Sequence, residues 1–240
     1  MPNKAQSRQR IIERLEMEYL RSLKQLTTEI DKIVRRYGPK DAAITQTILR
    51  RYAETVRPWA RIVAERMLQR VSRKDAASWI KLGNNIGKAL RKELDEAPTG
   101  QMLRQLLAEQ VHLITSLPLD AADRVHKLTM TGLVSGRRAE DIAKDILQTG
   151  QVTHSRAKLI ARTEVARTAS GLTMARAQHV GSTHYIWRTS RDPDVRESHR
   201  QMEGKVIAWD TPPTLSDGTV THAGMIYNCR CYPEPILSDD

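Results

Sequence analysis

Aromatic side chains are scarce in this sequence of 240 residues. Phe is absent, and Phe, Trp and Tyr together make up 4% of the chain. Hydrophobic residues nevertheless amount to 40%, which is within the range of folded globular proteins. We therefore expect aliphatic side chains and Met to fill most of the core, in one large domain or two small ones.

Cysteine is almost as scarce, because Cys229 and Cys231 are the only two. This excludes a disulfide framework. A bond between two cysteines one residue apart would close a strained ring. The pair fits an intracellular, reducing setting, and it also fits metal ligation.

Long apolar runs are missing as well. No segment approaches the ~20 apolar residues that a membrane-spanning helix needs, and no apolar run follows the charges of the first residues. We therefore expect neither a secretory signal nor a membrane partner.

Positive charge is concentrated at the beginning of the chain. Residues 1–95 carry 22 Lys and Arg against 11 Asp and Glu, whereas residues 96–240 are close to neutral and the whole chain has a net charge of +11. Such a surface attracts polyanions, since bound Lys and Arg release counterions from phosphates. A solvated helix surface explains the same charge equally well.

Basic pairs in this segment are the candidates for contact with double-stranded DNA or with an acidic face of another protein. No helix-turn-helix pattern accompanies them, so any reading of DNA would not be sequence-specific. The candidates are Arg35, Arg36, Arg50, Arg51, Arg73, Lys74, Arg91 and Lys92.

Apolar residues recur at helical spacing over most of the first 180 residues. Gly and Pro residues, together with Ser72 as a cap, are predicted to separate the helices, with Pro118 dividing the last pair of the first region. The expected helices span residues 8–36, 41–57, 58–71, 75–94, 100–116, 119–133, 138–147 and 155–180.

The pattern changes at Gly181. Residues 184–189 and 205–209 alternate and are predicted strands, 195–202 a short helix, and 225–235 an extended segment. The fold class is therefore α+β, with a long, mainly α-helical region (residues 1–136) followed by a small α+β module (residues 137–240) with a short antiparallel sheet. Tyr185 and Trp187 share a strand face, which favours core packing over the stacking of bases.

Several motifs follow one another in the predicted module. They are A-R-T-E at residues 161–164, W-x-T-x-x-D at 187–192, V-R-x-S-H at 195–199 and N-C-R-C at 228–231. Each motif is weak alone, but the ordered set resembles the phage head morphogenesis family, also called Mu protein F-like minor capsid proteins. The resemblance covers about the last 100 residues.

This resemblance implies a minor head protein of a tailed bacteriophage, made in the host cytoplasm and located in the virion, at the capsid interior or portal vertex. The implied partners are the portal protein, the major capsid protein or both, with packaged DNA contacted non-specifically and oligomers formed in the particle. It implies a structural role and no enzymatic activity.

The soft ligands of the module suggest a zinc site. His199, Cys229 and Cys231 are ligand types that Zn²⁺ prefers, and His222 or Asp192 would supply the fourth. Against this, C-x-C is not the usual C-x₂-C spacing, and both cysteines can simply pack as small hydrophobic residues.

Charged residues of the motifs form the second candidate group. We expect an internal polar lock in which Arg162 or Glu164 bonds to Arg196, Asp192 or His199. The full group is Arg162, Glu164, Arg167, Asp192 and Arg196.

Two other functions stay open at this stage. A catalytic site of Glu164, Asp192 and His199 would make the chain a nucleic-acid-acting enzyme or a toxin-like effector built on the same module. A metal-binding carboxylate cluster typical of nucleases is missing. The third reading is a nucleic-acid-binding protein outside the virion.

Overall fold

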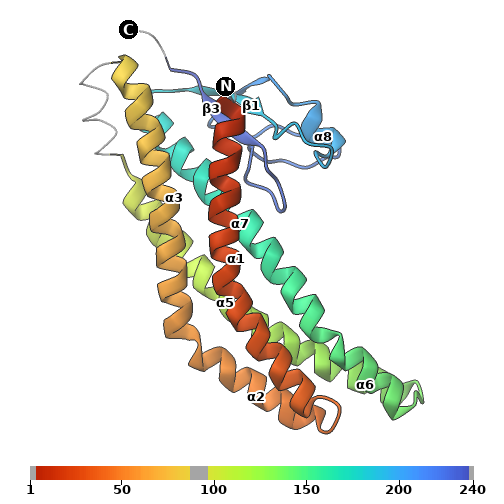
Figure 1. Cartoon of the computed structure of the whole chain (residues 1–240). Coiled ribbons are helices and arrows are strands. Elements are labelled where there is room, and N and C mark those ends of the chain that lie inside the picture. Colours follow the sequence, from red (N-terminus) through yellow and green to blue (C-terminus); the bar gives the residue numbers. More distant parts are fainter. Residues whose placement is uncertain (1–3, 87–96, 238–240) are drawn as a thin grey trace. The chain divides into compact units, whose positions relative to one another are not determined.

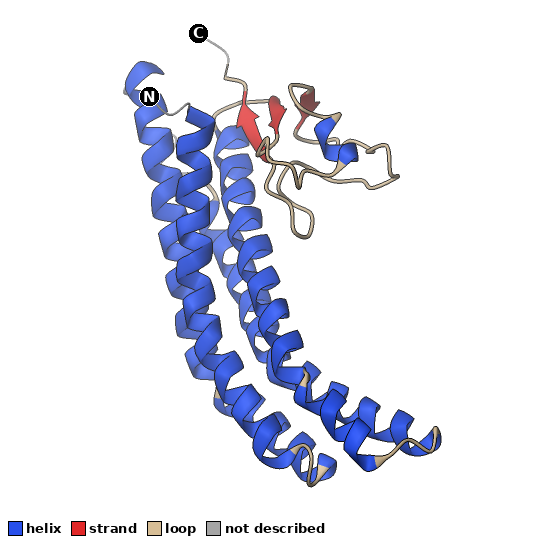
Figure 2. Cartoon of the chain, turned by 45° about the vertical axis from the view of Figure 1, so that its right-hand side comes forward, coloured by secondary structure: helices blue, strands red, loops and turns tan. Residues whose placement is uncertain are grey.

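The chain is mostly helical, and its few strands lie in the C-terminal part (Figure 2). The computed structural model describes residues 4–86 and 97–237. Its helices are α1 (Lys4–Tyr37), α2 (Ala42–Thr55), α3 (Arg57–Ile86), α5 (Thr99–Val134), α6 (Ala139–Leu147), α7 (Thr149–His179) and α8 (Glu197–Arg200) (Figure 1). Its strands are β1 (His184–Arg188), β2 (Val206–Ala208) and β3 (Tyr232–Pro235). The predicted α+β class is thus confirmed, and no described helix is both long and apolar enough to cross a bilayer.

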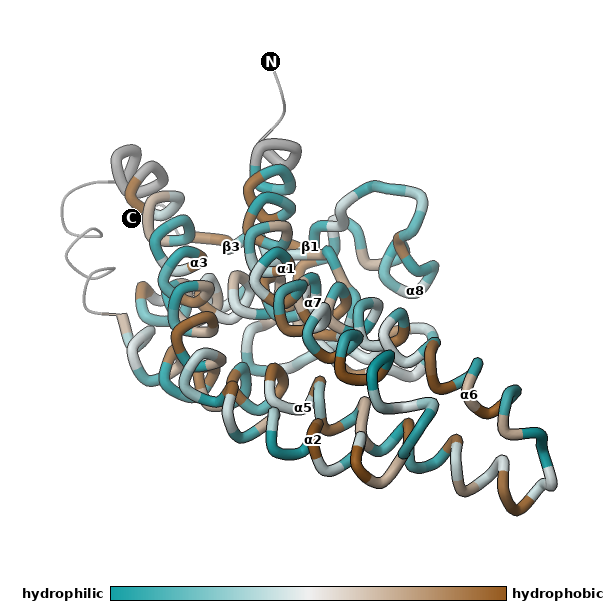
Figure 3. Tube along the Cα trace, turned by 60° about the horizontal axis from the view of Figure 1, so that its bottom comes forward, coloured by the Kyte–Doolittle hydropathy of each residue, from teal (hydrophilic) through white to brown (hydrophobic). Residues whose placement is uncertain are grey.

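The first helix shows why these segments are helical. Leu23, Leu26, Ile30 and Val34 recur every three or four residues along α1 and are almost completely buried, because this spacing places them on one face. Figure 3 shows the same alternation of polar and apolar residues along the described helices. At the start of α2, the Asp41 carboxylate accepts a hydrogen bond from the backbone N–H of Ile44 at 2.9 Å, as an N-cap does.

The break predicted at Pro118 is wrong, because α5 continues through it. A proline inside a helix removes one backbone hydrogen bond and costs about 3 kcal/mol. Ile114 and Leu117 before it, and Ala122 and Val125 after it, are fully buried. Continuing the helix keeps this apolar stripe in the core, which offsets the cost.

The break predicted at Ser72 is also wrong, because α3 is continuous from Arg57 to Ile86. Leu68, Val71, Asp75 and Trp79 are all buried at helical spacing, so one face stays in contact across the predicted cap. The remainder of the helix predicted to end at residue 94 lies outside the described residues.

The chain forms two compact units, each assembled from separate segments. Unit 1 comprises residues 1–16, 66–106 and 162–240, and unit 2 comprises residues 17–65 and 107–161. Their limits fall inside α1, α3, α5 and α7. The division predicted near residue 137 stays a prediction.

In unit 1, the three strands form an antiparallel sheet in the order β2-β1-β3. Tyr185 of β1 lies opposite Ile207 of β2, and Trp187 lies opposite Pro233 of β3. Both aromatic side chains are fully buried. Core packing is therefore confirmed for them, and the stacking of bases on them is ruled out.

The core below this sheet is shared with two helices of the same unit. Trp79 of α3 and Ala177 of α7 pack with Tyr185 and Trp187 of β1 and with residues of the segments between the strands. These are Met202, Trp209, Leu215, Ala223, Cys229 and Cys231. Four of the ten aromatic residues of the chain, namely Trp79, Trp187, Trp209 and Tyr185, thus pack together where a small sheet needs large side chains.

A buried charge network lies beside this core. Asp75 of α3 accepts hydrogen bonds from Arg176 and from Thr173 of α7, the latter at 2.8 Å. Arg8 of α1 donates to Thr173 at 3.4 Å, and its guanidinium lies 4.8 Å from the ring centre of Tyr232 in β3. Burial raises the pKa of Asp75, and the two arginines oppose that shift.

Candidate functional site

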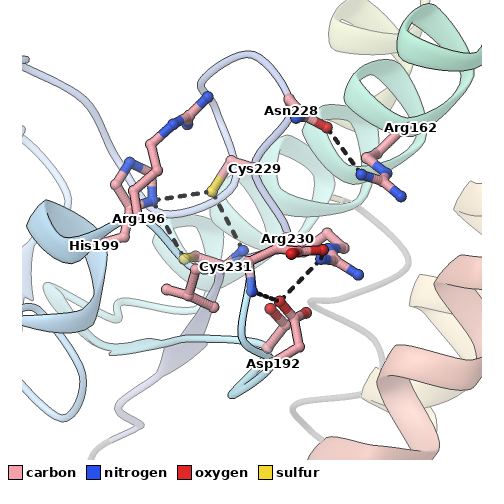
Figure 4. A pocket seen from close by; sticks show the side chains of 11 residues that line it. Arg162, Asp192, Arg196, His199, Asn228, Cys229, Arg230 and Cys231 are labelled. Carbon is pink, nitrogen blue, oxygen red and sulfur yellow. Dashed lines mark hydrogen bonds and ion pairs between the residues drawn. The ribbon is translucent and has the colours of Figure 1, made fainter.

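The A-R-T-E motif lies in α7, where one turn contacts the N-C-R-C segment. Arg162 donates a hydrogen bond to the side-chain oxygen of Asn228 at 3.1 Å (Figure 4). The Thr163 hydroxyl accepts one from the backbone N–H of Asn228 at 3.0 Å. Asn228 has a φ of 55°, a conformation that Asn tolerates better than most residues. The two contacts fix the backbone immediately before Cys229.

The V-R-x-S-H motif places His199 on the short helix α8. His199 is 2% exposed, and its ring meets Trp187 edge-on with the ring centres 5.7 Å apart. Ser198 beside it donates to Asp217 at 2.7 Å. This hydrogen bond and those from Thr219 lower the pKa of Asp217 to about 2. The hydrogen bond from Ser198 therefore ties α8 to the loop that contains Asp217.

Both cysteine sulfurs converge on one nitrogen of His199. The Sγ atoms of Cys229 and Cys231 each lie 3.4 Å from its Nδ1. The ligand atoms of the three residues all lie within 4.8 Å of one another. The two thiols are buried and are not joined by a disulfide.

The two thiols differ in their acidity. The hydrogen bond from Cys231, followed by contact with His199, lowers the pKa of Cys229. The same hydrogen bond and burial raise the pKa of Cys231. The backbone N–H of Cys231 also donates to the sulfur of Cys229 at 3.3 Å. The arrangement therefore favours a thiolate at Cys229.

The partners predicted for Arg162 in the polar lock are wrong, because Arg162 bonds to Asn228 and not to Asp192, Arg196 or His199. Asp192 accepts a hydrogen bond from Arg230 at 2.9 Å. Arg196 donates to the backbone oxygen of Tyr227 at 3.0 Å. Among the described residues, Asp192, Arg196 and Arg162 therefore all bond to residues 227–230 and not to one another. The sequence analysis assigns a role only to the thiols of the N-C-R-C motif. In the structure, Asn228 and Arg230 of this motif bond to Arg162 and Asp192.

These residues surround one small pocket of about 50 Å³ (Figure 4). The motif segments thus meet at one place although up to 69 residues separate them along the chain, as Arg162 and Cys231 show. The lining residues are Arg162, Ser190, Asp192, Asp194, Val195, Arg196, His199, Asn228, Cys229, Arg230 and Cys231.

Three of the residues predicted for the metal site and the polar lock, His222, Glu164 and Arg167, do not line this pocket. His222 is beside Tyr185, whose hydroxyl is 3.1 Å from its Nδ1, and it does not belong to the described group of His199 and the cysteines. Glu164 is buried, with one carboxylate oxygen 3.9 Å from Arg167, and it does not line the pocket. The catalytic set of Glu164, Asp192 and His199 is therefore not assembled around this pocket.

Glu16 of α1 does not line the pocket but interacts electrostatically with Arg162 and Arg230, which do, and the sequence did not reveal this. Burial raises its pKa to about 7, although Arg162 and Arg230 oppose the shift and Glu13 adds to it slightly. One of its carboxylate oxygens is buried with no hydrogen-bond partner among the described residues. Its position in an ordinary amphipathic pattern gave no signal of this environment.

The described basic pairs are exposed. Arg35 pairs with Asp31 at 2.7 Å and Arg50 pairs with Asp123 at 2.9 Å, which neutralises part of the charge. Arg36, Arg51, Arg73 and Lys74 are exposed too. Arg91 and Lys92 lie outside the described residues.

Comparisons with known proteins agree with the motifs. Residues 123–233 match the family described as Phage Mu protein F like protein, which confirms the resemblance expected for about the last 100 residues. A protein of unstated function from Haemophilus influenzae is 33% identical over 175 residues, which cover 71% of this chain and 38% of that protein. No solved structure matches the chain.

Two relatives with descriptive names are more distant. The minor head protein GP7 of Bacillus phage SPP1 is 23% identical over 165 residues, covering 62% of this chain and 51% of GP7. An NAD(+)–arginine ADP-ribosyltransferase, EFV, of Enterococcus faecalis is 28% identical over 122 residues, covering 47% of this chain and 25% of that protein. The chain thus spans between a quarter and about half of the length of these relatives.

Proposed function

Since residues 123–233 are a Phage Mu protein F like segment, we propose that the protein is a minor head protein of a tailed bacteriophage. In this proposal it is made in the host cytoplasm and incorporated into the virion, where its role is structural. The second line of support is its similarity to a protein named as a minor head protein in phage SPP1.

The observation that carries the proposal is the convergence of the family-like motifs. Arg162, Asp192, His199 and Cys229 come from separate motifs and line the same pocket. A chance set of short motifs has no reason to meet in space. Their meeting indicates that the ordered motifs specify one folded module rather than four unrelated segments.

The proposed partners are other head components, namely the portal protein, the major capsid protein or both, at the capsid interior or the portal vertex. The support is the family match alone. We expect several copies of the protein in one particle.

A nonsense codon in the gene of the phage, or of the prophage that carries it, tests this role. We expect particles of defective assembly or infectivity, restored by the wild-type chain supplied from a plasmid. A variant with Gly224 replaced by Ala, which disturbs the module, should restore less than one with Gly136 replaced by Ala. Normal particles and full infectivity from the nonsense mutant would contradict the proposal.

A non-specific contact with packaged DNA is a finer part of the proposal, supported by the exposed basic residues. The double variant Arg36→Glu/Arg51→Glu should bind duplex DNA more weakly than the wild type. Its binding constant should also change less with salt concentration, because fewer phosphates are contacted. Arg138→Glu makes the same kind of change at an exposed position outside the basic N-terminal segment and serves as the matched control. Equal binding by the wild type and the double variant would remove this surface from the proposal.

A toxin-like effector is the second candidate, favoured by the similarity to the ADP-ribosyltransferase. The similarity covers a quarter of that protein, and Glu164 does not line the pocket with His199. Incubation of the chain with labelled NAD⁺ and arginine-containing acceptor proteins distinguishes the two candidates. Transfer of label would favour the effector, and its absence together with presence in particles would favour the head protein.

A further inference from the structure

The three soft ligands of the module are arranged as around a metal ion. In a tetrahedral zinc site, with Zn–S about 2.3 Å and Zn–N about 2.0–2.1 Å, each sulfur lies about 3.5 Å from the nitrogen. Both Cys229 and Cys231 have their Sγ 3.4 Å from Nδ1 of His199. The spacing of the donor atoms therefore agrees with that of zinc ligands.

Hydrogen bonding alone accounts poorly for this convergence. The Nδ1 atom of an imidazole has one N–H or one lone pair in the ring plane, so it serves one partner well. Here two sulfurs approach the same nitrogen at the same distance. A cation between the three atoms would satisfy all of them at once.

The surroundings also suit a thiolate–metal centre. The backbone N–H of Cys231 points at the sulfur of Cys229, a contact that stabilises a ligating thiolate. Trp187 packs edge-on against the imidazole and limits its rotation. Asn228, held by Arg162, sets the turn that brings both cysteines of the C-x-C pair to one side.

We propose that His199, Cys229 and Cys231 bind one Zn²⁺ ion that joins α8 to the segment before β3. Among the described residues no further His, Cys, Asp or Glu joins this group. The fourth position faces the small pocket, where a water molecule would complete the tetrahedron. Asp192 also lines the pocket, but its carboxylate is held by Arg230.

The ion would link α8 to the segment before β3, although a water at the fourth position is more common in catalytic than in structural zinc sites. The segment between β2 and β3 contains a single isolated bridge, Thr214 to Val220, among the described residues. Its other internal backbone hydrogen bonds are short-range turns such as Met225 to His222 and Cys229 to Ile226. Structural zinc contributes directly to the folding free energy of small, loop-rich modules.

Metal analysis of the purified full chain is the first test. We expect about one zinc per chain in the wild type and none in Cys229→Ser/Cys231→Ser. His126→Asn, at an exposed position of α5, removes a histidine outside the group and should keep the full zinc content. Equal zinc in the wild type and the double variant would overturn the proposal.

Cobalt substitution of the wild type gives an answer that needs no variant, should the double variant not fold. Chelator-treated chain titrated with Co²⁺ should develop thiolate-to-cobalt charge-transfer absorption and the visible bands of a tetrahedral site. These bands should saturate at one equivalent and disappear when Zn²⁺ is added. A folded wild-type chain with two reduced thiols that takes up neither metal would overturn the proposal, and so would a Cys229–Cys231 disulfide in freshly purified protein.

The metal site and the role in the phage head are independent. A zinc-loaded chain absent from particles would leave the site standing and remove the proposed function. A metal-free chain present in particles would have the opposite consequence.

Discussion

The two compact units use charged residues in different ways. In unit 2, ion pairs such as Arg50–Asp123 and Arg61–Glu65 lie on the surface, and the buried hydrogen bond from Tyr19 to Gln110 joins uncharged groups. In unit 1, Asp75 and Arg176 are both at least 93% buried. Exposed pairs contribute little to stability, whereas breaking a buried pair is costly. The comparison indicates that the stability of unit 1 depends on a buried ion pair, whereas the exposed ion pairs of unit 2 contribute little to its stability.

Loss of the buried carboxylate should have the largest effect. Asp75→Ala leaves Arg176 and Arg8 without their shared partner in the interior, and we expect a loss of about 3–5 kcal/mol in the free energy of unfolding. Asp123→Ala, which breaks the exposed pair of unit 2, should cost less than about 1 kcal/mol. Denaturant unfolding followed by circular dichroism measures both, and similar losses for the two variants would contradict the comparison.

Backbone packing gives the next largest difference. A Cβ atom added at Gly224, where φ is +77°, would lie 2.1 Å from the Ser170 hydroxyl and 2.7 Å from the backbone oxygen of Cys231. Gly136 of unit 2 has a φ of +61° with nothing within 4 Å of the added atom. We expect Gly224→Ala to lower the free energy of unfolding by about 3 kcal/mol and Gly136→Ala to lower it by about 1 kcal/mol. Both substitutions strain the backbone, but only the first also creates a steric clash. Thermal melts measure the drop in melting temperature of each variant relative to the wild type. A larger drop for Gly136→Ala than for Gly224→Ala would contradict tight packing around Gly224.

The carboxyl group of Glu16 should produce a smaller effect that depends on pH. Its pKa is about 7 in the folded chain against an ordinary 4.5, so the folded state binds more protons than the unfolded chain between these values. Stability therefore falls as the pH rises from about 4.5 to 7, and the loss is fully present above pH 7. The nearby charged groups are Arg162, Arg230 and Glu13.

Glu16→Gln removes this ionisation. We expect the variant to gain about 2 kcal/mol over the wild type at pH 8.5, after allowance for solvent screening, and nothing at pH 4. Unfolding curves at both pH values provide the measurement. If the variant and the wild type differed in unfolding free energy by the same amount at pH 4 and at pH 8.5, burial would not destabilise the ionised carboxylate.

Much of the fold could be predicted because apolar spacing determines helices locally. The helix over residues 8–36 was expected on this ground and is found as α1. The helix breaks predicted at Pro118 and Ser72 are wrong because an apolar face continues on both sides of each residue. The packing of this face outweighs the local preference for a break. Such tertiary compensation leaves no trace in the residues next to the proline or the serine.

The candidate site was predictable to the extent that motif residues carry chemistry. His199, Cys229 and Cys231 were expected together and lie together. The partners of Arg162 and Asp192 were predicted wrongly, because hydrogen bonds between segments distant in sequence depend on backbone turns such as the one at Asn228. His222 has suitable chemistry, but the loop that carries it directs it to Tyr185.

The presence of the chain in purified particles tests the central claim most directly. Particles banded on a density gradient after nuclease treatment, and analysed by quantitative mass spectrometry, should contain this protein at a fixed number of copies per portal. A non-structural protein of the same phage, expressed at a similar level, should be depleted from the same band. If this chain is depleted to the same degree as that control, it is not a head component.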